Sequence, residues 1–314
     1  MVAYNHAGFL AGYPDAFSVM LARGHIAVDL FFLLSGFVLA RTYETRMPSA
    51  RKFLELRYRR LWLPVAVGVS IGALGFWMAG RNLGDIWLLL SAGLLIIPYP
   101  AFSVILNPPA WTVFYELLGN GLHALTLQRM NLRGLFAVIG ISASSLIVWD
   151  LLGADSKGLN VGQGETFFLG LPRLLMSYCF GIALYRLYGD RPRFSYWWGL
   201  LGFPIVVVVC GYVLPFHLEL LIALTVNPLV VLAALSLRHS RIAEALGALS
   251  YPIYAIHFPL QFILIAAGWQ WFWLLPISLL VSGCLGVLAD SRSRRTLGAI
   301  ISQMTVRPVT IKRT

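Results

Sequence analysis

The sequence consists of long apolar runs separated by short polar segments. Crossing the hydrocarbon core of a bilayer takes roughly 20 apolar residues in a helix. Nine runs approach that length and are predicted to be membrane helices: 27–40, 61–79, 111–127, 134–152, 168–187, 196–214, 219–236, 247–267 and 271–289. A tenth run, 86–98, is short and ends in Pro98-Tyr99-Pro100, so we expect a re-entrant segment there. The pattern predicts an all-α polytopic membrane protein with about nine full transmembrane helices.

The distribution of basic residues supports this topology, because cytoplasmic loops collect Lys and Arg. If 86–98 dips into the membrane without crossing, 20 of the 24 Lys and Arg fall in the predicted cytoplasmic segments 41–60, 128–133, 186–195, 237–246 and 290–314. A full crossing at 86–98 would move most of that charge outside. We therefore expect a membrane domain over residues 1–290 and a basic cytoplasmic tail over 291–314.

Composition excludes several other classes of protein. The chain is 59% hydrophobic and only 12% charged, whereas soluble domains carry about 25% charged residues. The net charge of +11 is therefore explained by membrane topology and not by nucleic-acid binding. The three cysteines lie in apolar runs without ligand spacing, so no metal site or disulfide framework is expected. Phosphate-binding loops and zinc-hydrolase motifs are missing from the sequence.

Charged and imidazole groups inside apolar runs are costly in lipid and need a partner or a hydrated pocket. His6, near the predicted outer surface, could be a general base or an exposed interfacial residue. Asp29 could complement the helix dipole at the outer end of its span, or orient a histidine or polar substrate. Glu116, close to Trp111, could pair with a neighbouring basic group or line a polar substrate pocket.

Two further groups of residues allow both a structural and a functional interpretation. Arg57 and Arg60 precede the 61–79 span and could anchor it at the cytoplasmic surface, or bind the phosphates of a cofactor such as coenzyme A. Tyr251, Tyr254 and His257 are spaced to share one helix face, as a polar cluster between helices or as substrate contacts.

Three of these segments, in this order, resemble motifs of the acyltransferase family 3 membrane proteins. They are residues 25–37 (HIAVDLFFLLSGF), 111–116 (WTVFYE) and 250–259 (SYPIYAIHFP), and the resemblance covers nearly the whole chain. The resemblance implies a unit of about ten spans that takes an acyl group from acyl-CoA on the cytoplasmic side. It also implies a required His on the first span, matched by His6, preceded by an Arg about eleven residues earlier. That Arg has no counterpart here, so we expect the first family helix to be truncated in this sequence.

The resemblance also implies roles for the other polar residues. Arg57 and Arg60 fit the family's cytoplasmic arginine motif, and Arg173 lies where the family often has an Arg that could stabilise an oxyanion. Asp29 and Glu116 would orient His6 or the acceptor.

These observations predict an O-acyltransferase of the bacterial inner membrane. It would move an acyl group, foremost acetyl, from acyl-CoA to a hydroxyl of a cell-surface carbohydrate or related acceptor. Acyl-CoA is then a substrate, and no bound cofactor is expected. The alternative is a transporter or flippase for a surface-glycan intermediate, with the same polar residues lining its path. A transporter typically shows internal repeats, and none is evident here.

Overall fold

The computed structural model describes residues 26–45, 47–97, 106–152, 164–213, 219–237, 240–270 and 272–286. This part of the chain is helical throughout and contains no strand. Its α-helices are α3 (Ile26–Tyr43), α4 (Ala50–Met78), α5 (Leu83–Leu94), α6 (Trp111–Leu125), α7 (Leu132–Leu151), α8 (Gly170–Tyr188), α9 (Tyr196–Val213), α10 (Glu219–Ala234), α11 (Arg241–Ala266) and a last helix, Phe272–Gly286. Short 3-10 helices are η1 (Pro108–Ala110), η2 (Leu127–Arg129) and η3 (Gly164–Leu169). His6 and the tail 291–314 lie outside the described residues.

Four of the described helical segments are long and apolar enough to cross a membrane: Ala50–Met78, Leu132–Leu151, Thr166–Tyr188 and Glu244–Ala266. Others are shorter than a full span, such as α5 with 12 residues, so the count of nine crossings remains a prediction. The outer faces carry large exposed apolar side chains, including Ile141 and Leu151 at 72% and 77% exposure. Exposing so much apolar surface on so many helices is unfavourable in water but not in the hydrocarbon of a membrane. The chain is a multi-pass membrane protein.

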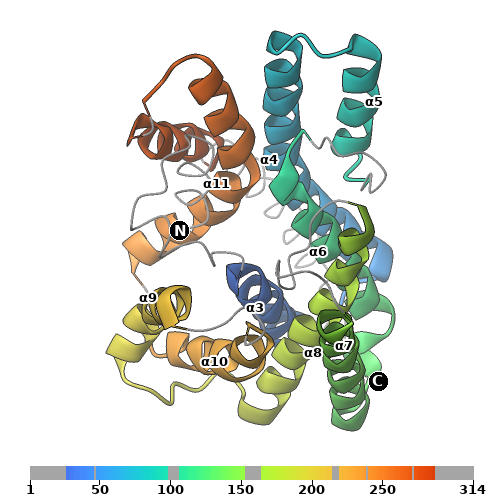
Figure 1. Ribbon diagram of the computed structural model, residues 1–314. Helices are drawn as coiled ribbons and strands as arrows, with labels where there is room; N and C mark the ends of the chain where they lie inside the picture. Colours follow the sequence, from blue (N-terminus) through green and yellow to red (C-terminus); the bar gives the residue numbers. More distant parts are fainter. Residues whose placement is uncertain are drawn as a thin grey trace, which may run out of the picture.

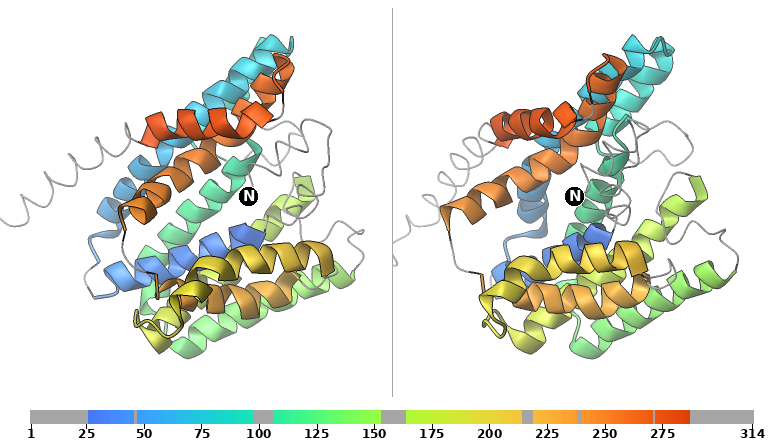
Figure 2. Two further views of the ribbon diagram at one scale, coloured as in Figure 1. Left: turned by 90° about the vertical axis from the view of Figure 1, so that its left-hand side faces the viewer. Right: turned by 60° about the vertical axis from the view of Figure 1, so that its left-hand side comes forward.

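The helices form two groups with α6 between them (Figures 1 and 2). One group contains α4, α5 and α11, and the other contains α3, α7, α8, α9 and α10. Each group has its own apolar core, and α6 contributes to both. Val113 packs with buried side chains of α4, α5 and α11, while Tyr115 packs with those of α3, α7 and α8. Polar residues of α6 are thereby placed at the junction of the two groups.

Glycines allow the closest approach in the second group, between α3 and α8. A Cβ atom on Gly36 would overlap the carbonyl of Tyr178, and one on Gly181 would overlap the carbonyl of Leu33. Membrane helices use small residues in this way, because close backbone contact replaces the hydrophobic driving force that lipid does not provide. The register of α3 against α8 is therefore fixed.

The direction of the chain at α5 bears on the expected re-entrant segment. Gly93, near the end of α5, lies against Val69, and the Leu94 carbonyl accepts a hydrogen bond from the Trp62 indole at 2.8 Å. The hairpin from α4 thus brings α5 down antiparallel to α4. By Leu106 the chain is beside Gly72 again, and α6 then runs antiparallel to α4 as well. α5 and α6 therefore point the same way, both antiparallel to α4, and the re-entrant segment at 86–98 stays a prediction.

Proline accounts for a polar contact between Asn107, just before η1, and α11. Pro259 has no N–H to donate to the Ala255 carbonyl one turn earlier. The Asn107 amide donates to that carbonyl instead, at 2.7 Å, and is fully buried. Gly68 of α4 makes room, since a Cβ atom there would meet both groups. A backbone group freed inside the membrane is satisfied by a side chain of the neighbouring segment.

Candidate functional site

The residues that stand out at the junction are Ser35, Arg57 and Glu116, which come from α3, α4 and α6. Glu116 is 1% exposed, and its Oε1 accepts hydrogen bonds from Arg57 Nη2 at 2.9 Å and from Ser35 Oγ at 3.0 Å. The Arg57 side chain is 16% exposed. A buried carboxylate is tolerated only when it is paired and hydrogen-bonded. This charged centre therefore ties the two helix groups together through α6.

The position of Glu116 follows from the pattern of α6. Thr112, Glu116 and Asn120 are spaced by four residues and share one face, and His123 continues it. All four are buried, with exposures of 1% or less. The seven-residue spacing of Glu116 and His123 thus places both on one buried face. A stripe of polar side chains thus runs along α6 through the interior.

A second buried ion pair joins α3 to α8. Arg173 Nε and Nη2 donate to the two carboxylate oxygens of Asp29, at 2.9 and 2.6 Å, and Ser177 Oγ donates to Asp29 at 3.4 Å. Asp29 and Arg173 are each 3% exposed. Two-point pairing of guanidinium and carboxylate is the strongest geometry available to these groups. The sequence had suggested separate roles for Asp29 and Arg173, and the structure brings them together.

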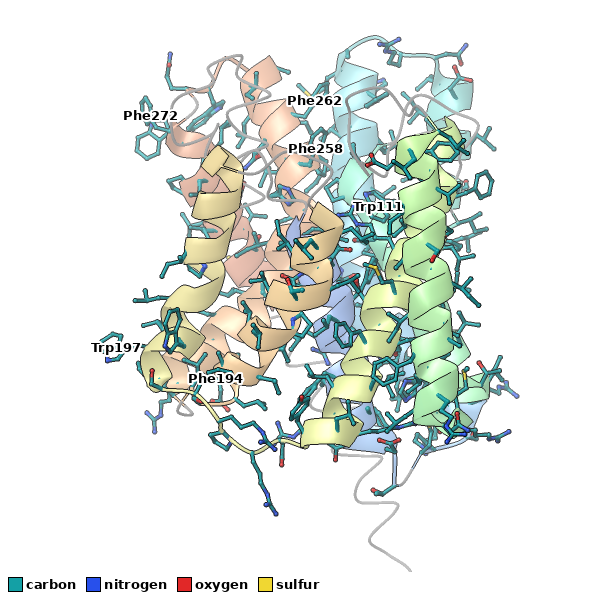
Figure 3. The ribbon with its side chains drawn as sticks, turned by 60° about the horizontal axis from the view of Figure 1, so that its bottom comes forward. Trp111, Phe194, Trp197, Phe258, Phe262 and Phe272 are labelled. Atoms are coloured by element: carbon teal, nitrogen blue, oxygen red, sulfur yellow. The ribbon has the colours of Figure 1, made fainter. Side chains whose placement is uncertain are left out.

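Trp111, at the start of α6, lies toward one end of the molecule. In Figure 3, Trp111 lies on the same half as Phe258 and Phe262 of α11, and Phe194 and Trp197 mark the other end. Trp111 packs edge-on against Phe32 of α3, with ring centroids 6.4 Å apart. This contact brings Trp111 into the interface of α3 and α6.

The three polar residues of α11 bond to backbone groups or to η1 and α6. Tyr251 donates to the Leu61 carbonyl at 2.7 Å. The Tyr254 hydroxyl lies 3.2 Å from the Pro109 carbonyl and 2.8 Å from Thr112 Oγ1. His257 Nδ1 lies 3.0 Å from a carbonyl of its own helix, which places a proton on Nδ1. The tyrosine bonds stabilise the contacts of α11 with α4, η1 and α6, whereas those of His257 Nδ1 lie within α11.

Arg57 and Arg60 differ in their surroundings. Arg57 is committed to Glu116. Arg60 is exposed and, within the described part of the chain, forms no ion pair. The neighbouring Arg59 pairs with Glu55 on the surface. Arg60, like Arg51 and Lys52 at the start of α4, thus remains available to an anionic ligand.

The sequence did not single out Ser35, Asn107 or Asn120. Ser and Asn are common between membrane helices, so their identity alone carries little signal. Asn120 could have been identified from its four-residue spacing from Glu116, which places both residues on the same face of α6. Ser35 is recognisable only once α3 and α6 are known to be neighbours.

The site and fold define a class: a helical membrane protein with a charged centre buried between two helix groups. The sequence model of a family described as "Acyltransferase domain", the acyltransferase 3 family, matches residues 1–289. The chain is also 32% identical over 151 residues to "Protein 2 in picA locus" of Rhizobium radiobacter, an alignment that covers 40% of this chain and 78% of that protein. No solved structure matches it significantly. This chain belongs to the acyltransferase 3 family, which favours a membrane acyltransferase over the transporter alternative.

Proposed function

We propose that this membrane acyltransferase moves an acyl group, foremost acetyl, from acyl-CoA to a hydroxyl of a cell-surface carbohydrate or related acceptor. The observation that carries the proposal is the buried Ser35–Glu116–Arg57 centre in a chain matched by the acyltransferase family over residues 1–289. A charged centre buried between helices in a membrane is costly, and helix packing alone does not require one. Its presence therefore supports a functional role.

The donor binds, in this proposal, at the end of the molecule where α4 begins. The predicted topology, with nine crossings and a dip at 86–98, puts that end in the cytoplasm and the protein in the inner membrane. Support comes from Arg60, which is exposed and lies one turn from Arg57. Guanidinium groups bind phosphate well, so Arg60 would bind the phosphates of coenzyme A. Arg57 would hold Glu116 in place.

The acceptor reacts at the other end, where α3 and α8 begin. There His6, outside the described residues, would take the proton of the acceptor hydroxyl or transiently carry the acyl group. Asp29 neutralises the charge of Arg173. The ion pair would therefore act near the reacting carbonyl as a fixed dipole and as part of the pocket lining. Trp111, Tyr254 and His257 would line the route between the two ends, with Tyr251 near its inner part.

The test is transfer of labelled acetyl from acetyl-CoA by the purified protein in detergent, with short oligosaccharides as acceptors. We expect label on the acceptor as an alkali-labile ester. His6→Ala should lower transfer by at least about 100-fold, since a general base contributes roughly 10²–10⁴ in rate. His217→Ala, a change of another imidazole in a predicted outer loop, is the matched control. Equal transfer by His6→Ala and His217→Ala would remove His6 from the mechanism.

A further inference from the structure

The inner half of the α6 stripe carries polar groups that no group in the described part of the chain satisfies. Among the described residues, Asn120 Nδ2 and both ring nitrogens of His123 are buried and have no hydrogen-bond partner. The same holds for Glu116 Oε2 and Arg57 Nε. Asn120 is 0% exposed and His123 1% exposed.

Three of these residues, Glu116, Asn120 and His123, form a row along α6. They lie on one face of α6, and seven residues of α-helix extend roughly 10 Å. The row faces α8: the Tyr178 hydroxyl lies 3.5 Å from Asn120 Oδ1, and its ring packs edge-on against His123 with centroids 5.9 Å apart. It leads from the charged centre toward the end of α6 at Leu125.

The row differs from the α11 side of the junction, where Tyr251 and Tyr254 bond to protein groups. Leaving a buried donor or acceptor without any partner costs about 1–3 kcal/mol. Ordered water is the usual partner of buried polar groups that protein atoms do not satisfy. The row also offers what a water chain needs, because it alternates acceptor, donor and imidazole groups at short intervals.

We propose that Glu116, Asn120 and His123 hold a chain of ordered waters between α6 and α8, and that this chain returns a proton across the protein during acyl transfer. The proposal rests on the proposed function. In that reaction the O–H bond of the acceptor and the C–S bond of the thioester break, and an ester C–O bond and the S–H bond of coenzyme A form. The proton lost by the acceptor is therefore the one gained by the thiolate.

In the proposed function the acceptor loses its proton at the outer end, whereas coenzyme A leaves toward the cytoplasmic end, so a path between the two ends lets the departing thiolate regain a proton there. A row of hydrogen-bonding groups with waters conducts protons, whereas an apolar interface does not. His123, as an imidazole at the inner end of the row, is suited to pass a proton on. Asn120 and Tyr178 act as positioning residues, because they orient waters without changing charge.

The first experiment detects the waters directly and does not depend on activity. Hydroxyl radicals made by X-ray pulses label side chains that contact water, including internal water. Tyr178 and Tyr115 form a matched pair, since both are buried at 3% exposure or less. The Tyr115 hydroxyl bonds to the Phe167 carbonyl at 2.8 Å within an aromatic cluster. We expect Tyr178 to be labelled at least about tenfold faster than Tyr115, and His123→Leu to bring it to the level of Tyr115. Equal labelling of the two tyrosines in the wild type would overturn the proposal.

The second experiment measures labelled acetyl transfer by His123→Leu and by Leu122→Met, its neighbour on α6 as the control. We expect His123→Leu to lower kcat at least about tenfold, with the KM for acetyl-CoA unchanged, because proton transfer typically contributes 10²–10⁴ in rate. If His123→Leu keeps the kcat of the wild type although Tyr178 is labelled in the wild type, the waters are present but do not relay the proton. That result would overturn the relay. Failure of the wild type to transfer acetyl would instead overturn the proposed function, and the labelling result would still decide the water chain.

Discussion

The pair of Arg57 and Glu116 should couple the two helix groups energetically. Glu116→Gln keeps the size of the side chain but removes its charge. The Arg57 guanidinium then loses its counterion, and the Ser35 hydroxyl donates to a weaker acceptor. We expect the free energy of unfolding to fall for either Glu116→Gln or Arg57→Gln, and the double variant to fall by less than the sum of the two.

The size of the effect follows from burial. Two unit charges about 4 Å apart attract by about 4 kcal/mol at an effective dielectric constant of about 20. Removing one partner of a fully buried pair costs about 3–5 kcal/mol. The Glu116 side chain is 1% exposed but that of Arg57 is 16% exposed, so water partly solvates the guanidinium left behind. We therefore expect a loss of about 2–3 kcal/mol for Glu116→Gln and a coupling energy of about 2 kcal/mol.

The assay is a double-mutant cycle on the free energy of unfolding in mixed detergent micelles. Arg59 and Glu55 provide a control cycle on the same helix: their ion pair spans 2.6 Å, but the side chains are 65% and 52% exposed. An exposed pair of this spacing contributes about 0.3–0.5 kcal/mol. A coupling energy for Arg57 and Glu116 no larger than that of the control pair would refute the reasoning that Glu116 is a buried, charge-paired centre.

Two further predictions concern the packing that holds the site. Gly181→Ala should lower the Tm, because its Cβ would lie closer than 3.0 Å to a backbone carbonyl of α3 and force the helices apart, at about 1–3 kcal/mol; Gly140→Ala, with open space at its Cβ, should leave the Tm unchanged or raise it, and equal losses would argue against the close contact. Asn107→Ala should cost about 1–3 kcal/mol by leaving the Ala255 carbonyl unsatisfied. Adding Pro259→Ala restores an N–H to that carbonyl, so the double variant should recover stability in the same unfolding assay, and no recovery would contradict the role given to the proline.

The positions of the helices along the chain were predictable from the lengths of the apolar runs. Each predicted span coincides with a helix or with most of one, and the short run 86–98 corresponds to the 12-residue helix α5. The boundaries were less predictable. The 61–79 span belongs to a helix that already begins at Ala50. Its first turns are rich in Arg and Lys, which favour helix but are not apolar, so a hydropathy pattern does not include them.

The partners of the buried charges were not predictable from one sequence. Hydropathy indicates that Asp29 and Glu116 need compensation, but Asp29 lies 144 positions from Arg173 and Glu116 lies 59 from Arg57. Which helices become neighbours depends on how well their surfaces fit together. Glycines such as Gly36 allow that fit where two helix backbones are in contact. Sequence reasoning could therefore name the charged residues and could not pair them.

In the proposed function, a thioester donor on the cytoplasmic side acylates a hydroxyl on the outer side. The most direct measurement uses proteoliposomes with the protein in one orientation, labelled acetyl-CoA on one side only and an impermeant oligosaccharide on the other. We expect labelled ester on the oligosaccharide only when acetyl-CoA is on the side of Arg60, where α4 begins. Ester formation only when donor and acceptor share one side would contradict it.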